Sequence, residues 1–486
     1  MRVRLRLACC CLAVAVLAGC AGAPRGEPAG AVLTRAEQAM GAAAVNSLRY
    51  AGSGSGAVFG QAYQPGGAWP RVHYTSFARV LDYAHGALRE DYARSRAEPT
   101  GGGALPLMGS GEQRVTGLMR DGFAWNLAGP APVAAPVALE GRFHDLWTTP
   151  HGALKAARKD PRSEAGSAGG RTWVRFDAGP ALRATLWLGP DHLVERVESV
   201  QPHPVLGDLT SVTDYSGYRD FGGVRFPTRI RQQQGGFPVL DLAVGEVQIN
   251  PPAGIEVPAL VRAARENVTA EKAAEGVWFL AGGSHNSVAI EMQDHLIVVE
   301  APLYDGRSQA VLAEARRLAP GKPIRFVINS HHHFDHAGGL RAAVAENATL
   351  VTSELARPWF ERVLANPNSQ QPDAMQRAGR PARVVGVGSR QTMGDGLRRL
   401  EIHQIEGGVH AQGFLMVYLP SERLLIEADA YTPGPPNAPP PQPVNANHLN
   451  LLQNIERLGL QVDRILPLHG RMVPLAELYH AVGRRP

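Results

Sequence analysis

Five ionisable side chains stand within six consecutive residues in the second half of this chain. The segment reads Ser-His-His-His-Phe-Asp-His-Ala-Gly-Gly over residues 330–339 and fits the spacing His-x-His-x-Asp-His followed by small residues. Chance produces that spacing in about one of a thousand chains of this length and composition. Neutral imidazoles and carboxylates are ligands of zinc and of other borderline divalent metals. The segment therefore predicts a metal site.

The spacing divides these side chains between two ions. His331 and His333 lie two residues apart on an extended strand end, so both point the same way and can bind one metal. Asp335 and His336 follow where the chain turns into a helix, and they can face a second metal. His332 points the opposite way from its two neighbours, and we expect it to pack or to support a ligand.

Strands and helices must hold this segment in place, and the sequence predicts both around it. Residues 324–329 form a buried strand that leads into the histidines, and Gly338 and Gly339 let the backbone pass close to the site. Further strands are expected at 276–280, 287–292 and 295–300, and helices at 307–318 and 447–458. Such alternation of strands and helices is typical of α/β architecture.

The first half of the chain follows a different pattern, in which apolar and polar residues alternate. Residues 182–188 and 193–200 are two such runs, joined by the turn sequence Gly-Pro-Asp at 189–191. Alternating runs joined by short turns predict an antiparallel sheet with one buried face. Thr34 and Glu37 form a capping box, which predicts a helix that begins at Thr34 before the sheet.

Breaks in these patterns divide the chain into parts. The run Asn-Pro-Pro-Ala-Gly at 250–254 ends the alternating pattern, and seven prolines within 433–443 predict a stiff loop. We therefore expect an α+β protein with a signal peptide at 1–19, a tether at 20–33, an antiparallel β-rich domain with an N-terminal helix at 34–252, a linker helix at 253–273 and a catalytic domain at 274–486.

The histidine segment resembles the signature of the metallo-β-lactamase-fold superfamily. The resemblance covers about residues 274–480 and implies an αββα sandwich with a dinuclear site at one edge. It also implies three further ligands: His410 as the third ligand of the first metal, Asp429 as the bridging carboxylate and His469 as the last ligand of the second metal. The implied metal ligands are thus His331, His333, Asp335, His336, His410, Asp429 and His469.

Two other residues acquire roles from the same resemblance, and Tyr431 is a third candidate because it stands two residues past Asp429. The strand at 295–300 ends in Glu300 where the family commonly has an aspartate, and we expect this carboxylate to brace a ligand from one methylene further out. His285 lies in a loop that borders the active-site mouth in the superfamily, so it is either a substrate contact or an ordinary loop histidine. Tyr431 is a candidate to polarise a substrate carbonyl oxygen, or else a packing residue.

The implied chemistry is metal-assisted hydrolysis. Two ions that share Asp429 would also share a water and lower its pKa to about 7, which supplies hydroxide at neutral pH. Asp335 is a catalytic candidate because it can protonate the leaving group. An aspartate at the bridging position points away from β-lactams and toward the glyoxalase-II-like, lactonase-like and arylsulfatase-like branches. We expect an enzyme with two zinc ions, or with iron or manganese, that hydrolyses an ester, thioester, lactone or related small molecule.

Two other functions stay open on the sequence alone. The same fold carries mononuclear iron enzymes that oxidise sulfur, although a complete second ligand set speaks against this hypothesis. Alternatively, the second domain is inert and the protein is a non-catalytic, lipid-binding lipoprotein. The N-terminal sheet loosely resembles the lipoprotein-carrier fold, which suits it either to bind a hydrophobic substrate or to hold the catalytic domain away from a membrane.

The first twenty residues have the pattern of a secretory signal. Arginines at 2, 4 and 6 precede an apolar run at 7–16 that is too short to span a membrane. Leu-Ala-Gly-Cys at 17–20 resembles the lipobox of bacterial lipoproteins, which implies cleavage before Cys20 and acylation of that residue. Because Ala21 follows, the pattern resembles outer-membrane sorting, and we expect an exported, lipid-anchored protein that faces the periplasm. An ordinary signal peptide is the alternative.

Composition limits the classes of partner. The chain has 486 residues, 44% of them hydrophobic and 19% charged, with a formal net charge of +5. Loss of the three leader arginines would leave +5 − 3 = +2, so the charge does not indicate nucleic-acid binding. The four cysteines all lie at or before Cys20, which leaves disulfides and cysteine nucleophiles out of the chemistry. We expect a small-molecule substrate and a membrane contact through Cys20, with the oligomeric state open.

Overall fold

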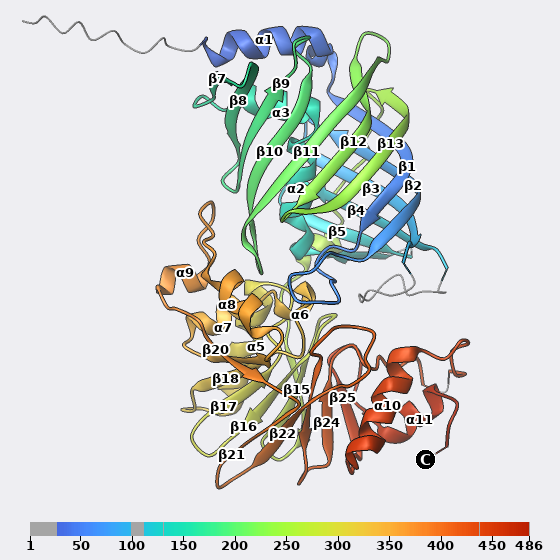
Figure 1. The fold of residues 1–486 in the computed structure, drawn as a ribbon, viewed down its shortest axis with the longest axis vertical. Coiled ribbons are helices and arrows are strands. Elements are labelled where there is room, and N and C mark those ends of the chain that lie inside the picture. Colours follow the sequence, from blue (N-terminus) through green and yellow to red (C-terminus); the bar gives the residue numbers. More distant parts are fainter. Residues whose placement is uncertain (1–26, 99–110, 130, 437, 486) are drawn as a thin grey trace, which may run out of the picture.

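The computed structural model describes residues 27–98, 111–129, 131–436 and 438–485. These residues form two lobes, a β-rich N-terminal domain above and a C-terminal domain below in Figure 1. The expected signal peptide at 1–19 and the expected anchor residue Cys20 lie outside the described residues. Within the described part of the chain, no helix combines the length and the apolar character needed to cross a membrane.

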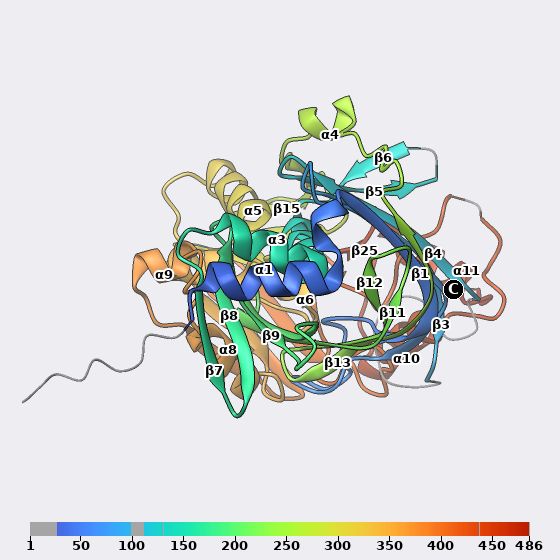
Figure 2. The same cartoon turned by 90° about the horizontal axis from the view of Figure 1, so that it is seen from above.

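One antiparallel sheet makes up most of the N-terminal domain. Among the described residues it has thirteen strands, in the order β6-β5-β4-β3-β2-β1-β13-β12-β11-β10-β9-β8-β7. The strands are β1 (Ser47–Ala57), β2 (Arg71–Asp82), β3 (Ala87–Arg96), β4 (Gln113–Arg120), β5 (Phe123–Ala128), β6 (Ala131–Ala134), β7 (Glu164–Ala168), β8 (Arg171–Ala178), β9 (Leu182–Leu188), β10 (Val194–His203), β11 (Gly207–Asp220), β12 (Arg225–Gln234) and β13 (Phe237–Ile249). The sheet curls around a hollow side (Figures 1 and 2).

The alternating sequence pattern explains which face of this sheet is buried. Along β9, Leu182, Leu186 and Leu188 are buried, whereas Arg183 between them is exposed. Residue Val194 of β10 lies opposite Leu188, so the expected hairpin forms across the Gly-Pro-Asp turn. The expected antiparallel sheet with one buried face is therefore confirmed for this part of the chain.

Three helices cover the hollow side, α1 and α3 toward the end far from the second domain and α2 nearer to that domain (Figure 1). They are α1 (Ala29–Met40), α2 (Leu139–Trp147) and α3 (Pro150–Lys159). Leu33 of α1 and Leu154 of α3 share one core with Phe226 and Leu242 of the sheet, and each of these side chains is almost fully buried. Burial of this apolar face is the main stabilising contribution to the helices, since short helices are marginal alone.

The first helix begins earlier than the capping box predicted. It starts at Ala29, so residues 29–33 of the expected tether are helical. The Thr34 hydroxyl lies inside the helix and donates to the carbonyl oxygen of Gly30 at 2.9 Å. Val32 and Leu33 are each only 2% exposed, and burial of these two side chains favours the extra turn over a start at Thr34.

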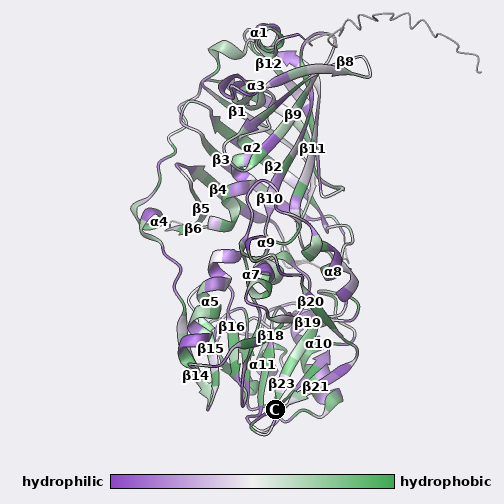
Figure 3. Ribbon diagram, turned by 90° about the vertical axis from the view of Figure 1, so that its left-hand side faces the viewer, coloured by the Kyte–Doolittle hydropathy of each residue, from purple (hydrophilic) through white to green (hydrophobic). Residues whose placement is uncertain are grey.

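The expected linker helix at 253–273 is wrong over most of its length. Only α4 (Ala259–Ala263) is helical, and it lies on the connection that runs along one side of the molecule in Figure 3. Residues Thr269–Ala274 form the edge strand β14, in which Thr269 pairs with Ala281 of the next strand. Pairing at a sheet edge gives this segment its backbone hydrogen bonds and overrides the helix propensity of its alanines and charged residues.

Two sheets pack face to face in the C-terminal domain. The first runs β14-β15-β16-β17-β18-β19-β20 and the second β21-β22-β23-β24-β25-β26 among the described residues. The strands are β14 (Thr269–Ala274), β15 (Val277–Ala281), β16 (Ser287–Glu291), β17 (Leu296–Val299), β18 (Ile324–Ile328), β19 (Thr349–Ser353), β20 (Arg383–Val387), β21 (Arg390–Gly394), β22 (Arg399–Gln404), β23 (Leu415–Leu419), β24 (Leu424–Glu427), β25 (Arg464–Pro467) and β26 (Val473–Pro474).

Helices cover the outer faces of both sheets. The helices of this domain are α5 (Asp305–Leu318), α6 (Phe334–Ala337), α7 (Leu340–Ala345), α8 (Arg357–Ala365), α9 (Ala374–Ala378), α10 (Ala446–Leu458) and α11 (Leu475–Ala481). Leu312 of α5 and Phe360 of α8 pack in the core of the first sheet, whereas Leu452 of α10 packs with the second. The layers follow the order helix, sheet, sheet, helix, and the expected α+β class is confirmed.

Candidate metal centre

The structure brings all seven expected ligands together and adds one residue to them. It places them in two groups, and within each group the ligand atoms lie within 4.8 Å of one another. The first group consists of His331, His333, His410 and Asp429, and the second of His285, Asp335, His336 and His469. Metal binding by these groups stays a prediction, but their division between two sites is the one that the spacing indicated.

The ends of parallel strands place these residues side by side. In the second sheet, β24 and β25 run parallel, and Glu427 lies opposite Pro467. Asp429 and His469 each follow two residues after this pair, so the two chains leave the sheet at the same edge. In the first sheet, β18 ends at Ile328 just before the histidine segment, and this end faces the same space. Active sites of layered α/β folds commonly lie at such strand ends.

Glycines let the backbone pass close to neighbouring segments just after the histidine segment. After the two expected ligands of the first site, the chain enters α6. There the backbone N–H of Ala337 donates to the backbone carbonyl oxygen of His333 at 2.9 Å. A Cβ on Gly338 would lie 1.9 Å from the carbonyl oxygen of Leu303, and one on Gly339 would lie 1.8 Å from Oγ of Ser308. Both positions therefore require glycine, as the sequence indicated.

The atoms of the first group face a common point. Nε2 of His331 and Nε2 of His410 lie 3.1 Å apart, at 3.2 and 2.9 Å from Oδ2 of Asp429. Nδ1 of His333 is buried and has no hydrogen-bond partner among the described residues. A buried, unpaired nitrogen beside a buried carboxylate is costly unless a cation is bound, so this donor set fits a metal ion.

Hydrogen bonds on the far side of the rings fix which nitrogen faces the centre. Nε2 of His333 donates to the carbonyl oxygen of Ala62 at 3.0 Å, which leaves the lone pair on Nδ1. Nδ1 of His331 lies 2.9 Å from Oγ of Ser330, so its Nε2 faces inward. Such outer partners orient the imidazoles of metal sites and keep them in the tautomer that binds.

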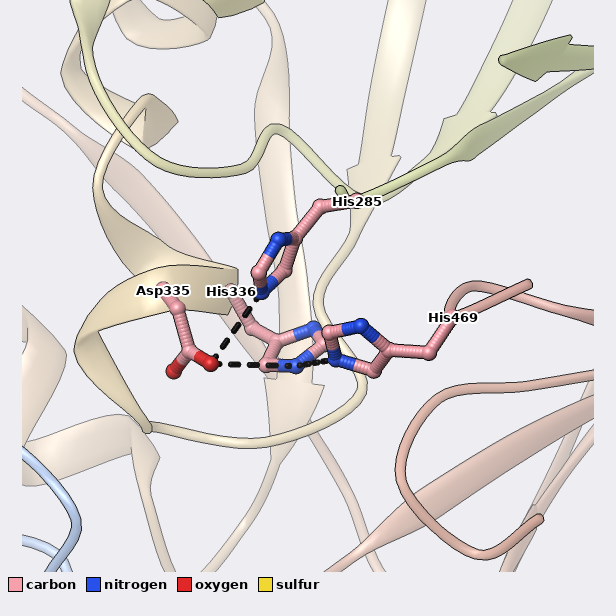
Figure 4. Close-up of side chains that lie close together, drawn as sticks. All are labelled: His285, Asp335, His336 and His469. Atoms are coloured by element: carbon pink, nitrogen blue, oxygen red, sulfur yellow. Dashed lines mark hydrogen bonds and ion pairs between the residues drawn. The ribbon is translucent and has the colours of Figure 1, made fainter. Parts of the chain in front are cut away.

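The second group converges in the same way (Figure 4). Nε2 of His336 and Nε2 of His469 lie 3.1 Å apart, and Nε2 of His285 lies 3.1 Å from Oδ2 of Asp335. The same His469 nitrogen is 2.8 Å from Oδ1 of Asp429, a residue of the first group. Oδ2 of Asp429 faces the first group and also lies 3.0 Å from Nε2 of His336, so this carboxylate contacts both groups, which is the position of one that can join two metals.

Glu300 lies where a supporting carboxylate was expected. It is fully buried, and its Oε2 lies 3.3 Å from Nδ1 of His336. Its Oε1 accepts a hydrogen bond from the backbone N–H of Ser330 at 2.5 Å. This carboxylate thereby holds both the start of the histidine segment and one imidazole of the second group.

The electrostatics of the two groups favour a bound cation. Burial lowers the pKa of His331 and of His333 well below the usual value, which keeps both rings neutral and able to bind a metal. Burial also acts to lower the pKa of His336, but Asp429 and Asp335 outweigh it and raise that pKa well above its usual value. The buried carboxylates therefore stabilise positive charge at this point.

A loop of the N-terminal domain reaches this centre, which sequence reasoning missed. The loop between β1 and β2, residues 58–70, descends to α6 in Figure 1. Nε2 of Gln61 donates to Oδ1 of Asp335 at 2.8 Å, and the carbonyl of Ala62 accepts from His333. The backbone carbonyl of Tyr63 also accepts from the N–H of Gln412 at 2.7 Å. Between 271 and 349 residues separate these partners in sequence, and no local pattern marks them.

His285 and Tyr431, the two candidate substrate contacts, have different positions. His285 joins the second group, because Asn286 ties its loop to the His469 loop through a hydrogen bond from its backbone N–H to the carbonyl of Leu468 at 2.8 Å. Tyr431 lies in the core, 2% exposed and edge-on to His448, and lines a cavity of about 580 Å³ along the proline-rich loop. The structure thus places His285 among the ligand candidates and gives Tyr431 a packing position.

His332 lies outside both groups. Its Nε2 is 2.8 Å from the carbonyl oxygen of Ala62, and its ring lies 5.9 Å from that of Trp359. The side chain therefore points away from the centre, as expected for the residue between two ligands on an extended segment.

Comparison with known proteins agrees with this geometry. Residues 280–469 match the family model described as the Metallo-beta-lactamase superfamily, over about two fifths of the chain. The match extends from β15 to His469 and includes every residue of both groups. The C-terminal half therefore carries a metallo-β-lactamase superfamily domain, and the expectation of an enzyme domain with this hydrolase fold is confirmed.

A curated relative and several solved structures are similar to parts of the chain. The 2,4-dinitroanisole O-demethylase subunit alpha of Nocardioides sp. (strain JS1661) is 28% identical over 170 residues, which are 35% of this chain and 48% of the relative. The chain thus spans about half the length of this curated relative.

Metallo-β-lactamases of three bacteria are among the similar solved structures. The protein from Pontibacter korlensis is 17% identical, with 45% of this chain and 98% of that chain covered and a TM-score of 0.35. That from Hirschia baltica is 19% identical, with 44% and 96% covered and a TM-score of 0.34. The mono-zinc form of FIM-1 from Pseudomonas aeruginosa is 18% identical, with 44% and 93% covered and a TM-score of 0.34.

The contact between Gln61 and Asp335 predicts that the N-terminal domain strengthens metal binding. Leucine at position 61 keeps the bulk of the side chain and removes the donated hydrogen bond, so we expect zinc affinity of the weaker site to fall about tenfold or more. The measurement is competition with a chromophoric chelator. Gln64→Leu is the matched control, because this residue of the same loop is exposed. Equal affinities of both variants and the wild type would contradict the prediction.

Proposed function

Starting from a C-terminal half with a metallo-β-lactamase superfamily domain, we propose that the protein is a hydrolase with two zinc ions, acting on an ester, thioester, lactone or related small molecule outside the cytoplasm. The position of Asp429 carries this proposal. Its oxygens lie 2.8 Å from His469 and 2.9 Å from His410, one ligand candidate of each group. Iron or manganese would suit the same nitrogen and oxygen donors.

Two bound ions would supply activation of a water at neutral pH and polarisation of a substrate carbonyl oxygen. The residues of this chain provide the remaining functions. Asp429 holds the two halves of the site in register, and Glu300 fixes the ring of His336 from behind. Most of these side chains are almost fully buried, and Asp335 and His469 are the most exposed of them, so water reaches the site from their side. The substrate must approach from that side.

Asp335 is placed to move a proton. Burial acts to raise the pKa of its carboxyl, but the charge of His336 and the hydrogen bond with His285 outweigh burial and lower that pKa. The group is therefore a carboxylate at neutral pH, which accepts a proton from the attacking water and passes it to the leaving group. Gln61 on Oδ1 and His285 on Oδ2 hold its orientation.

The complete second group favours this function over that of a mononuclear iron enzyme. Three imidazoles and one carboxylate converge there, and Asp429 lies 3.0 Å from Nε2 of His336. A site for one ion alone would gain nothing from burying this set of polar groups, which is costly without a cation. A non-catalytic lipoprotein would have no use for either group.

The sequence supports a location and a substrate range for this activity. The lipobox-like residues 17–20 support export with a lipid anchor at Cys20, in the outer membrane facing the periplasm. The curated relative is by its name an O-demethylase of 2,4-dinitroanisole, so the proposed substrate range includes a carbon–oxygen bond of a small aromatic molecule.

Loss of one ligand in the first group should remove one of the two metal ions and most of the turnover. For His410→Ala we expect the zinc content to fall by about one ion per chain and turnover to fall by more than about 100-fold, because outer partners alone are worth 10–100-fold. Mass spectrometry of the metals and an ester assay measure the two effects. His73→Ala is the control, since His73 is exposed on the N-terminal sheet. Turnover that persists after loss of the metal would contradict the proposal.

Proton transfer through Asp335 should depend on the leaving group. Asparagine at this position cannot carry the proton, so we expect Asp335→Asn to slow an alkyl ester at least about tenfold more than a nitrophenyl ester, whose leaving group needs no proton. The ratio of the two kcat/KM values cancels any common loss of metal. An unchanged ratio would assign Asp335 to metal binding alone.

A further inference from the structure

A cavity of about 870 Å³ lies between the hollow side of the N-terminal sheet and the C-terminal domain. The sheet contributes Phe77 and Tyr92 to its wall, and the C-terminal domain contributes Leu303, Phe334 and Asp335. We propose that this cavity binds the substrate of the hydrolase, and that the substrate is an uncharged ester with a long apolar chain. The inference rests on the proposed hydrolase function and names its substrate class.

The cavity leads to the metal centre. Asp335 lines it and also belongs to the second group of ligand candidates, with Oδ2 3.1 Å from His285. The next wall residue, Phe334, packs edge-on against Phe59 of the β1–β2 loop at 5.3 Å between ring centres. An ester group at Asp335 would therefore have its chain directed away from the centre, along the sheet.

Aromatic side chains form the wall along which this chain would lie. Tyr74 packs edge-on against Phe77 at 5.4 Å, and Phe77 stacks with Tyr92 at 6.3 Å. These rings lie on neighbouring strands, so their faces form a continuous apolar surface. Pockets of 300–1,000 Å³ hold small molecules, and a volume near the upper end of that range leaves room for a long chain.

Carboxylates outnumber arginines along the wall, which disfavours an anionic substrate. Six carboxylates and three arginines are among the described residues that line the cavity. Arg79 is already neutralised, because it forms ion pairs with Glu90 and, at 2.6 Å, with Asp145. The wall thus repels anions and offers apolar contact to an uncharged ligand.

Chain-length selectivity tests the cavity. In a series of neutral nitrophenyl esters from acetate to decanoate, each added methylene that is buried should raise kcat/KM about fourfold until the cavity is full. Tryptophan at position 141 of α2 fills the cavity, since Gly141 lines it and no described atom lies within 4 Å of a Cβ built there. We expect Gly141→Trp to lose at least tenfold of the preference for decanoate over acetate, with its zinc content unchanged.

Gly245→Trp is the matched control. Gly245 lies on β13 outside the cavity wall, and a Cβ built there also meets no described atom within 4 Å. This variant should retain the selectivity of the wild type. The cavity proposal would be overturned if the wild type showed no chain-length preference, or if the two tryptophan variants had equal selectivity. It would also be overturned if a cationic choline ester were turned over faster than a neutral ester of equal length.

Binding without turnover separates this inference from the proposed function. N-phenylnaphthylamine, an uncharged fluorescent probe, should bind the wild type and be displaced by methyl decanoate, and Gly141→Trp should weaken its binding at least tenfold. If the zinc-loaded protein cleaves no ester but binds the probe in this way, the hydrolase function fails and the apolar cavity stands. Absence of probe binding to the wild type would overturn the cavity proposal whatever the enzyme assays show.

Discussion

A carboxylate buried among imidazoles is stable only where positive charge lies beside it, and Asp429 is such a group. Its Oδ2 lies within 3.2 Å of nitrogens on three histidines and its Oδ1 within 2.8 Å of a fourth. These histidines come from three loops that end different strands. The packing of the two sheets therefore determines whether the Asp429 carboxylate lies beside these imidazoles. Their mutual attraction in turn explains why so many buried polar groups lie at one edge of the domain.

The N-terminal domain takes part in the same network. The β1–β2 loop accepts a hydrogen bond from His333 at Ala62 and donates one to Asp335 through Gln61. Each group of ligand candidates in the C-terminal domain thus has a hydrogen-bond partner in the N-terminal domain. The cavity under the curled sheet ends at the same Asp335. A domain that orients the ligand candidates and encloses the approach to them affects both metal binding and substrate selection. Both effects depend on the contacts between the β1–β2 loop and α6.

Much of the centre could be predicted from the sequence, because ligand spacing and alternating burial are local properties. The His-x-His-x-Asp-His segment and the β9–β10 hairpin are of this kind. Contacts between distant segments left no such pattern: Gln61 is an ordinary loop residue until the fold brings it to Asp335. The prediction of a linker helix was wrong for a related reason: residues 269–274 form an edge strand because they pair with β15, and the local sequence does not reveal this pairing. Tyr431 was a candidate because its phenol stands two residues past Asp429 in sequence, and its surroundings in the core decided between that role and packing.

The number of metal ions per chain tests the central claim most directly. The purified protein would be freed of metal by dialysis against a chelator, loaded with zinc, passed through a desalting column and measured by mass spectrometry against protein concentration. Two zinc ions per chain are expected, because Asp429 faces two complete groups of donors. One ion per chain, or none, would contradict a centre in which this carboxylate joins two metals.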